Sequence, residues 1–93
     1  MPDVSLETRL KVSDDVVFRE LDGEAVLLNL ASGLYFGLNP IGTRMWQLID
    51  ERRDLADVAA VLCDEFDAPA ATIEADLVRL VGELLARGLM VRA

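Results

Sequence analysis

Two hydrophobic periods divide the chain near Asn39. Before this residue, apolar residues come in short runs that are separated by residue pairs favouring tight turns, at Asp22-Gly23 and Ser32-Gly33. The runs predict strands that start near Val16 and Ala25, followed by a last strand from Leu34 to Leu38. The few residues between the runs leave room only for hairpin connections. We therefore expect an antiparallel meander of about three strands.

After Asn39 the apolar residues follow a helical period. Asn39-Pro40 places a good N-cap residue before a proline at the first helical position, and this first helix is expected to end near Arg52. Asp54 can cap a second helix. A third, longer helix follows Pro69 and ends at Gly88. A meander followed by three helices predicts an α+β, winged-helix-like domain.

The domain is expected to span residues 16–93. Residues 1–15 are polar apart from Leu6, Leu10 and Val12, and they are predicted to be either an arm or a short edge strand. The apolar run at 89–91 is expected to return to the sheet or to the core.

Two predicted elements have a wide apolar surface. The third helix has a central stripe formed by Ile73, Leu77, Leu80 and Leu84, and further apolar residues widen it to an arc of about 160°. Either a central helix of a small domain touches more neighbours, or something besides the helix pair and the sheet covers this margin. The last strand is apolar on both faces and carries Gly37, a residue type that in strands often marks a close approach of another backbone or a bulge. Either the first helix folds over this strand, or its edge stays open for a peptide to add as a further strand.

The residue types that are missing exclude most catalytic chemistry. The chain has no His and a single Cys, so neither a Ser-His or Cys-His nucleophile nor a zinc site of Cys and His can be built. Cys63 lies among apolar residues and is predicted to be a buried small hydrophobe. The acidic pairs and runs lack the spacing of a Ca²⁺ loop. A chain of 93 residues also has little core to give up for a deep substrate cavity. We expect no enzyme activity and no cofactor or metal.

The charge narrows the range of partners. A formal charge of −8 repels phosphate, so nucleic acid is an improbable partner. No segment approaches the roughly 20 apolar residues of a membrane span, and the first residues show no apolar run of signal-peptide length. We expect a soluble, cytoplasmic protein that does not bind membranes.

The sequence resembles the PqqD family. The similarity covers about residues 16–91, and its parts follow in the family's order and spacing. They are Leu38-Asn39, Gly42, Trp46, Leu48-Ile49-Asp50, Leu55-Ala56-Asp57-Val58, Leu62, Asp76-Leu77, Leu80, Leu84 and Arg87-Gly88-Leu89. Leu89 stands where PqqD proper is expected to have Trp, so the chain is more similar to the short B1 proteins of lasso-peptide clusters than to members of the pyrroloquinoline quinone pathway.

The resemblance implies a non-enzymatic domain that binds the leader segment of a ribosomally made precursor peptide and presents it to modifying enzymes. In a lasso-peptide pathway these partners are a leader peptidase and a cyclase. The leader is expected to add as a strand to the last strand of the meander and to lie in the groove between that strand and the third helix. The implied peptide-binding residues are Leu34, Tyr35, Phe36, Gly37, Leu38, Ile73, Asp76, Leu77, Leu80 and Glu83.

Two other classes of function remain as alternatives. A generic protein-interaction or dimerisation module fits the same composition. A winged-helix DNA-binding regulator fits the helix order, although its recognition helix would carry Glu74, Asp76 and Glu83 where phosphate contact requires a basic face. Asp76 itself is predicted either to stabilise helix packing through a neighbouring Arg or to bind a basic leader residue.

Overall fold

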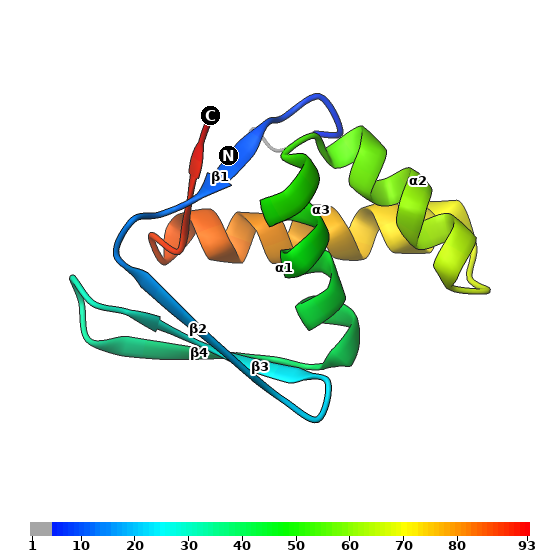
Figure 1. Ribbon diagram of the computed structural model, residues 1–93. Helices are drawn as coiled ribbons and strands as arrows, with labels where there is room; N and C mark the ends of the chain where they lie inside the picture. Colours follow the sequence, from blue (N-terminus) through cyan, green and yellow to red (C-terminus); the bar gives the residue numbers. More distant parts are fainter. Residues whose placement is uncertain (1–4) are drawn as a thin grey trace.

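A computed structural model describes residues 5–93, and it places a three-stranded sheet against a group of three helices (Figure 1). The elements in chain order are β1 (Leu10–Val12), β2 (Val16–Leu21), β3 (Glu24–Asn29), β4 (Leu34–Leu38), α1 (Pro40–Arg52), α2 (Leu55–Glu65), α3 (Ala70–Ala86) and β5 (Met90–Arg92). The predicted α+β class and the meander followed by three helices are confirmed.

The meander is held in register by two tight loops. Asp22 and Gly23 both have positive φ, at 55° and 82°, which is the type I′ conformation that matches the twist of a two-residue hairpin. The strand order is β2-β3-β4, and both neighbouring pairs are antiparallel. Because β3 is central, β2 and β4 are the two edges of this sheet.

One face of the sheet covers the helices and the other faces solvent. Leu27 lies opposite Phe18 on one side and Phe36 on the other, and all three side chains point toward the helices. Tyr35 stands on the outer face and is 69% exposed. The buried face of the last strand is therefore the one that carries Phe36 and Leu38.

Side-chain caps set where the first two helices begin. The Asn39 carboxamide accepts a hydrogen bond from the Gly42 N–H at 2.8 Å, and Pro40 follows it at the first helical position, as the sequence predicts. Asp54 accepts from the Ala56 N–H at 2.9 Å and caps α2. The Asn39 cap fixes the start of α1 directly after β4, so the helix starts where the edge strand ends.

The chain ends form a separate two-stranded sheet. β1 pairs antiparallel with β5, with Leu10 opposite Arg92 and Val12 opposite Met90. Leu10 is fully buried, and Leu89 and Met90 are almost fully buried. The run at 89–91 thus joins β1 and the core rather than the meander, and residues 10–12 form an edge strand in that second sheet. Residues 1–4 of the expected arm lie outside the described part of the chain.

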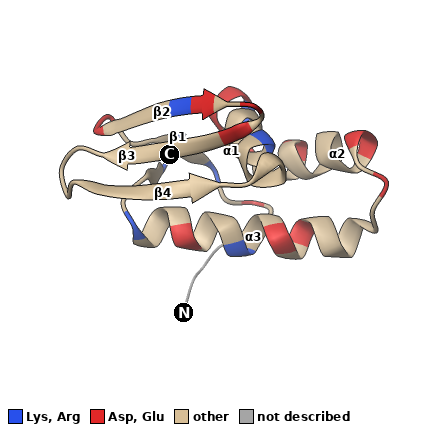
Figure 2. Ribbon diagram, turned by 90° about the horizontal axis from the view of Figure 1, so that it is seen from below, with Lys and Arg blue, Asp and Glu red and all other residues tan. Residues whose placement is uncertain are grey.

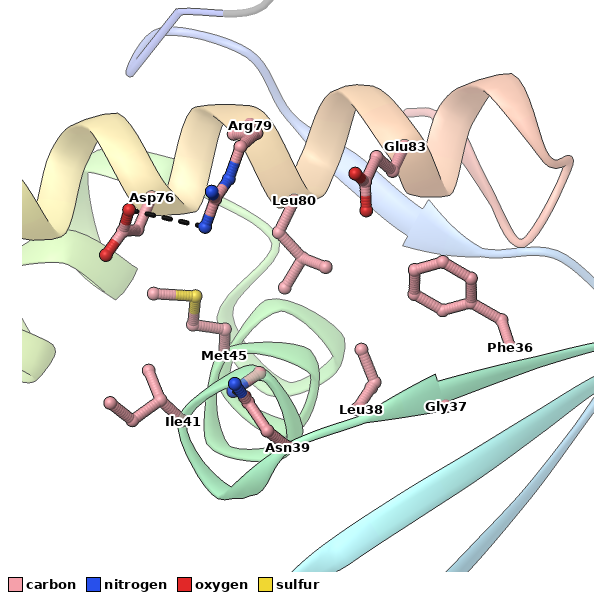
Figure 3. Close-up of a pocket in the computed structure, with 11 residues that line it drawn as sticks. Phe36, Gly37, Leu38, Asn39, Ile41, Met45, Asp76, Arg79, Leu80 and Glu83 are labelled. Carbon is pink, nitrogen blue, oxygen red and sulfur yellow. Dashed lines mark hydrogen bonds and ion pairs between the residues drawn. The ribbon is translucent and has the colours of Figure 1, made fainter.

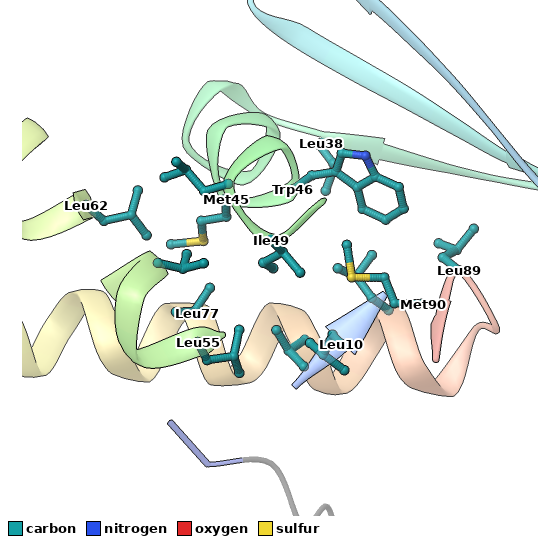
Figure 4. Packing of buried hydrophobic residues seen from close by; sticks show 14 of the residues in the cluster. Leu10, Leu38, Met45, Trp46, Ile49, Leu55, Leu62, Leu77, Leu89 and Met90 are labelled. Atoms are coloured by element: carbon teal, nitrogen blue, oxygen red, sulfur yellow. The ribbon is translucent and has the colours of Figure 1, made fainter. Parts of the chain in front are cut away.

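Most of the core lies among the three helices, with Leu27 and Leu38 of the sheet packed against it (Figure 4). Trp46 belongs to this core and is 3% exposed. On α3 the buried stripe is formed by Ile73, Leu77, Val81 and Leu84. The stripe predicted from the sequence includes Leu80, but Leu80 is only half-buried, and Val81, which is not in that stripe, is fully buried. Cys63 is also half-buried rather than enclosed. The helix packs against α2 and β5, which moves its buried centre away from Leu80.

A bidentate ion pair joins α1 to α2. The Arg44 guanidinium donates to both carboxylate oxygens of Glu65, with Nε to Oε1 at 2.8 Å. This hydrogen bonding lowers the pKa of Glu65 and raises the pKa of Arg44. The pair is solvent-accessible, so it orients the two helices more than it stabilises the fold.

Asn29 ties the end of β3 to the end of α3. Its buried side-chain amide donates to the Arg87 carbonyl at 3.0 Å, and its Oδ1 accepts from the Ala31 N–H at 2.9 Å. These bonds hold the β3–β4 loop at the C-terminal end of α3 and so help to set the spacing between β4 and this helix.

Asn29→Ala is expected to lower the free energy of unfolding by about 1–3 kcal/mol, because buried donors and acceptors lose their partners. Chemical denaturation measures the loss. Thr72→Ala, at an exposed position of α3, serves as the control and is expected to change stability by less than about 0.5 kcal/mol. Equal losses in the two variants would mean that the Asn29 side chain does not bind the helix end in solution.

Candidate peptide-binding groove

A groove of about 300 Å³ lies between β4, the start of α1 and the middle of α3 (Figure 3). Its lining residues are Phe36, Gly37, Leu38, Asn39, Ile41, Gly42, Met45, Asp76, Arg79, Leu80 and Glu83. The floor is apolar, with Leu38 and Met45 continuing into the core. Charged side chains of α3 line one wall, so the groove suits a chain with apolar residues toward the floor and polar residues at the rim.

The edge of β4 supplies backbone donors and acceptors beside this groove. The Gly33 N–H donates to the Asn29 carbonyl at 2.7 Å, which shows that this carbonyl points toward the β4 side, whereas the next N–H, that of Leu30, donates toward β2 to the Asp15 carbonyl. In an antiparallel ladder this direction alternates from residue to residue.

The register then divides the residues of β4 into two sets. Leu34, Phe36 and Leu38 lie opposite Asn29, Leu27 and Ala25. The backbone groups of Phe36 and Leu38 therefore point toward β3, while the Leu34 N–H donates to Ser32 Oγ at 3.3 Å. The N–H and C=O groups of Tyr35 and Gly37 point away from the sheet. These are the groups that an added strand would bond.

The first helix leaves this edge open. Leu38 is 6% exposed where α1 begins, but Leu34 is 63% exposed and Phe36 half-buried. The first helix therefore covers only the C-terminal end of β4, and the rest of the strand's edge is open.

Gly37 takes part in regular pairing opposite Val26, without a bulge. A Cβ at this position would meet no atom within 4 Å, so no backbone within the chain approaches it closely. The expectation of a close approach or a bulge is thus not met by the folded domain itself.

The structure brings together six of the ten residues that were predicted for the site from the sequence. Phe36, Gly37, Leu38, Asp76, Leu80 and Glu83 line the groove. Ile73 and Leu77, which are 6% and 0% exposed, lie in the core below it. Leu34 and Tyr35 lie farther along β4, beside a second hollow of about 280 Å³ at the C-terminal end of α3.

Phe36 and Arg87 separate this second hollow from the groove. The Arg87 guanidinium lies over the Phe36 ring, 5.0 Å from its centre. Phe36 lines both spaces, while Arg87 lines only the second. A cation–π contact of this kind bridges β4 and α3 without filling the groove.

Several lining residues were not predicted from the sequence. Ile41 and Met45 are apolar residues of α1, and both line the groove, although Ile41 is 47% exposed and Met45 is buried. Asn39 caps α1 and lines the groove as well. The signal that could have found them is their position one and two turns from the strand end, on the side of α1 that faces the third helix.

The wall of α3 carries both signs of charge. Arg79 Nη2 lies 3.4 Å from Asp76 Oδ1, one turn away on the same helix (Figure 3). Glu83, the third charged lining residue, has no cation within 4.0 Å in the part of the chain that the structure describes. The Asp76–Arg79 contact lies within one helix and is exposed, so it does not join α3 to another element, and contact of Asp76 with a basic leader residue stays a prediction.

Acidic positions outnumber basic positions on α3. Figure 2 shows the acidic positions along this helix, with a basic position between them. Within residues 5–93, no group of three or more carboxylate or thiol side chains is placed to hold a metal ion. Among the helices formed by these residues, none is both long and apolar enough to cross a bilayer.

The fold and the groove define a class of small domains in which a sheet edge and a helix form a site for an extended peptide. The chain belongs to the PqqD family, because the model of that family, described as coenzyme PQQ synthesis protein D, matches residues 24–90. No curated protein matches the chain with comparable significance.

Two solved structures show the same fold. One is TbiB1 in complex with the TbiA(beta) leader peptide, which is 36% identical, with a TM-score of 0.81, over 86% of this chain and 93% of that chain. The other is a lasso peptide synthetase B1 complexed with the leader peptide, which is 26% identical, with a TM-score of 0.80, over 89% of this chain and 98% of that chain.

Proposed function

We propose that this protein binds the leader segment of a ribosomally made precursor peptide as an added strand on β4. The observation that carries the proposal is the open edge at Tyr35 and Gly37 beside the groove of β4 and α3. In this mode main-chain hydrogen bonds supply affinity, and pockets for alternate side chains supply specificity. The peptide's inward side chains would lie against Phe36, Leu38 and Leu80.

The similarity to two B1 proteins that were solved with leader peptides supports this choice of ligand. It also favours a lasso-peptide pathway over the quinone pathway that gives the family its name. We propose that the domain acts without chemistry of its own and presents the leader to a leader peptidase and a cyclase in the cytoplasm. The absence of His from the chain is in keeping with a binding role.

The test is a titration of two synthetic peptides with readout by amide chemical shifts. One is the TbiA(beta) leader, and the other is a scrambled peptide of the same composition. For the leader, saturable shifts centred on residues 34–38 and on the groove-facing side of α3 are expected, and the scrambled peptide should bind more weakly. Shifts centred on α2, or no saturable binding of the leader, would contradict the proposal.

The charged wall of α3 is expected to tune affinity rather than to create it. Glu83→Arg should weaken binding of a basic or neutral leader by about 0.5–2 kcal/mol and flatten its salt dependence, as expected of a rim charge. Asp76→Arg should have a smaller effect on binding, because Arg79 already offsets this carboxylate. Isothermal titration at two salt concentrations, with thermal melts of each variant, measures both effects. Unchanged affinity in both variants would remove the electrostatic contribution.

A protein-interaction or dimerisation module remains the second candidate, and the outer face of the sheet favours it. Leu21, Val26 and Tyr35 are 77%, 46% and 69% exposed on this face. Contiguous exposed apolar side chains mark interaction surfaces. Sedimentation at rising protein concentration tests self-association, and a dimer that dissociates on Val26→Lys would support this candidate.

A further inference from the structure

Two charged side chains at the C-terminal end of α3 flank Phe36 of β4. Glu83 lines the groove on one side of Phe36, and Arg87 lines the second hollow on its other side. Figure 3 shows the side chains of Glu83 and Leu80 pointing from the helix toward the strand. Both charged residues therefore lie beside the open edge of β4.

Neither side chain has a counter-ion within the part of the chain that the structure describes. No cationic nitrogen lies within 4.0 Å of the Glu83 carboxylate, and no carboxylate oxygen lies within this distance of the Arg87 guanidinium. Arg87 directly follows the last residue of α3, and its guanidinium rests on the Phe36 ring instead of pairing with Glu83. Both residues are exposed, so each is accessible to a charged side chain of a bound peptide.

The direction of α3 relative to β4 sets the order in which a bound peptide meets these charges. The groove joins Leu38 to the middle of the helix, whereas the second hollow joins Leu34 to Arg87. The helix and the strand therefore run antiparallel (Figure 1). From the level of Leu38 to that of Leu34, a peptide on the edge of β4 would pass Leu80 first, then Glu83 and then Arg87.

The spacing of the two charges matches the period of a strand. Four residues of a helix rise by about 6 Å along its axis. Neighbouring side chains on one face of a strand are two residues apart, which corresponds to about 6.7 Å. In a strand added to β4, every second side chain points toward the helices, as Phe36 does, and the others point to the outer face of the sheet. Two successive inward side chains would thus stand beside Glu83 and Arg87.

We propose that the peptide bound at β4 carries a Lys or Arg beside Glu83 and, two residues further on, an Asp or Glu beside Arg87. A strand that pairs antiparallel with β4, as β3 does, has the more stable ladder and runs from the level of Leu38 to that of Leu34. Its inward side chains are then apolar, basic and acidic in this order from its N-terminal end. The aliphatic stem of the basic residue covers Phe36 while its cation reaches Glu83. The inference rests on the proposed function, because it assigns the chemistry of a peptide at the same site.

The test compares two synthetic peptides of the same composition and net charge. Acetyl-Val-Thr-Leu-Thr-Lys-Thr-Glu-Thr-Val-amide has the proposed order of charges. In acetyl-Val-Thr-Leu-Thr-Glu-Thr-Lys-Thr-Val-amide the Lys and the Glu are exchanged. Titrations are followed by the amide shifts of residues 34–38. We expect saturable binding of the first peptide and about fivefold weaker binding of the second, because two ion pairs at the rim become contacts between like charges.

Charge-exchanged variants make the test specific for these two residues. Glu83→Arg combined with Arg87→Glu keeps the net charge of −8 and should reverse the preference, so that the second peptide binds more tightly. As the matched control, Arg19→Glu combined with Glu24→Arg exchanges two exposed charges on β2 and β3 and should leave the preference unchanged. Circular dichroism gives the folded fraction of each variant.

Equal affinity of the wild type for the two peptides, or tighter binding of the second, would overturn the inference. A folded Glu83→Arg, Arg87→Glu variant that keeps the wild-type preference would also overturn it. A parallel titration with the TbiA(beta) leader separates this inference from the proposed function. If the leader binds at residues 34–38 and neither synthetic peptide binds up to a millimolar concentration, the charge pattern is wrong and strand addition stands. If the leader does not bind there either, both fail.

Discussion

Gly37→Pro is expected to abolish strand addition at β4 while leaving the domain folded. Proline has no N–H to donate, and its ring occupies the space where the partner strand would approach. The outward N–H of Gly37 has no partner in β3, and a Cβ at this position meets no atom within 4 Å, so the folded domain tolerates the change. The loss of an interstrand bond and the unpaired group left on the peptide should cost about 2–4 kcal/mol of binding free energy.

The matched variants make this prediction specific. Gly37→Ala keeps the N–H and should retain leader binding. Tyr35→Pro, at the other outward position, should weaken binding as Gly37→Pro does. Phe36→Pro instead removes a bond to Leu27 within the sheet and should destabilise the domain by about 3 kcal/mol or more. Isothermal titration gives the affinities and circular dichroism the folded fraction. Gly37→Pro binding the leader with unchanged affinity would place the leader elsewhere.

Leu80→Ala is expected mainly to weaken leader binding and Leu77→Ala mainly to lower stability, although the two residues lie one turn apart on α3. Leu77 is fully buried, so its truncation leaves a cavity and should lower the free energy of unfolding by about 2–5 kcal/mol. Leu80 is half-buried and lines the groove. Its truncation should cost little stability but about 1–2 kcal/mol of leader binding, as for a central contact residue.

Urea denaturation and titration of the folded protein separate the two effects. At a temperature where Leu77→Ala remains folded, its affinity for the leader should be close to that of the wild type. Weaker binding by Leu77→Ala, together with unchanged binding by Leu80→Ala, would show that the peptide reaches a different face of α3. Val78→Ala, at a half-buried position that does not line the groove, provides a control on the same helix.

Local sequence signals predicted the elements well because each of them depends on neighbouring residues. The Asp22-Gly23 pair adopts the positive φ values that a two-residue hairpin requires. Asn39 followed by Pro40 fixes the start of α1 through a cap that the residues themselves carry. The family resemblance then directed attention to β4 and α3, and the groove lies between them.

The sequence by itself determined the order of strands and helices, the absence of histidine chemistry and the acidic surface, because these follow from residue type and local period. Only the tertiary structure decided which apolar residues of α3 are core and which line the groove. An apolar stripe 160° wide looks the same to a periodicity argument whether Leu80 or Val81 lies at its centre. The rotation of α3 is set by its packing against α2 and β5, and its contacts with β5 depend on where the end of the chain folds. For the same reason, the pairing of β1 with β5 and the second hollow beside β4 became visible only once the chain was folded.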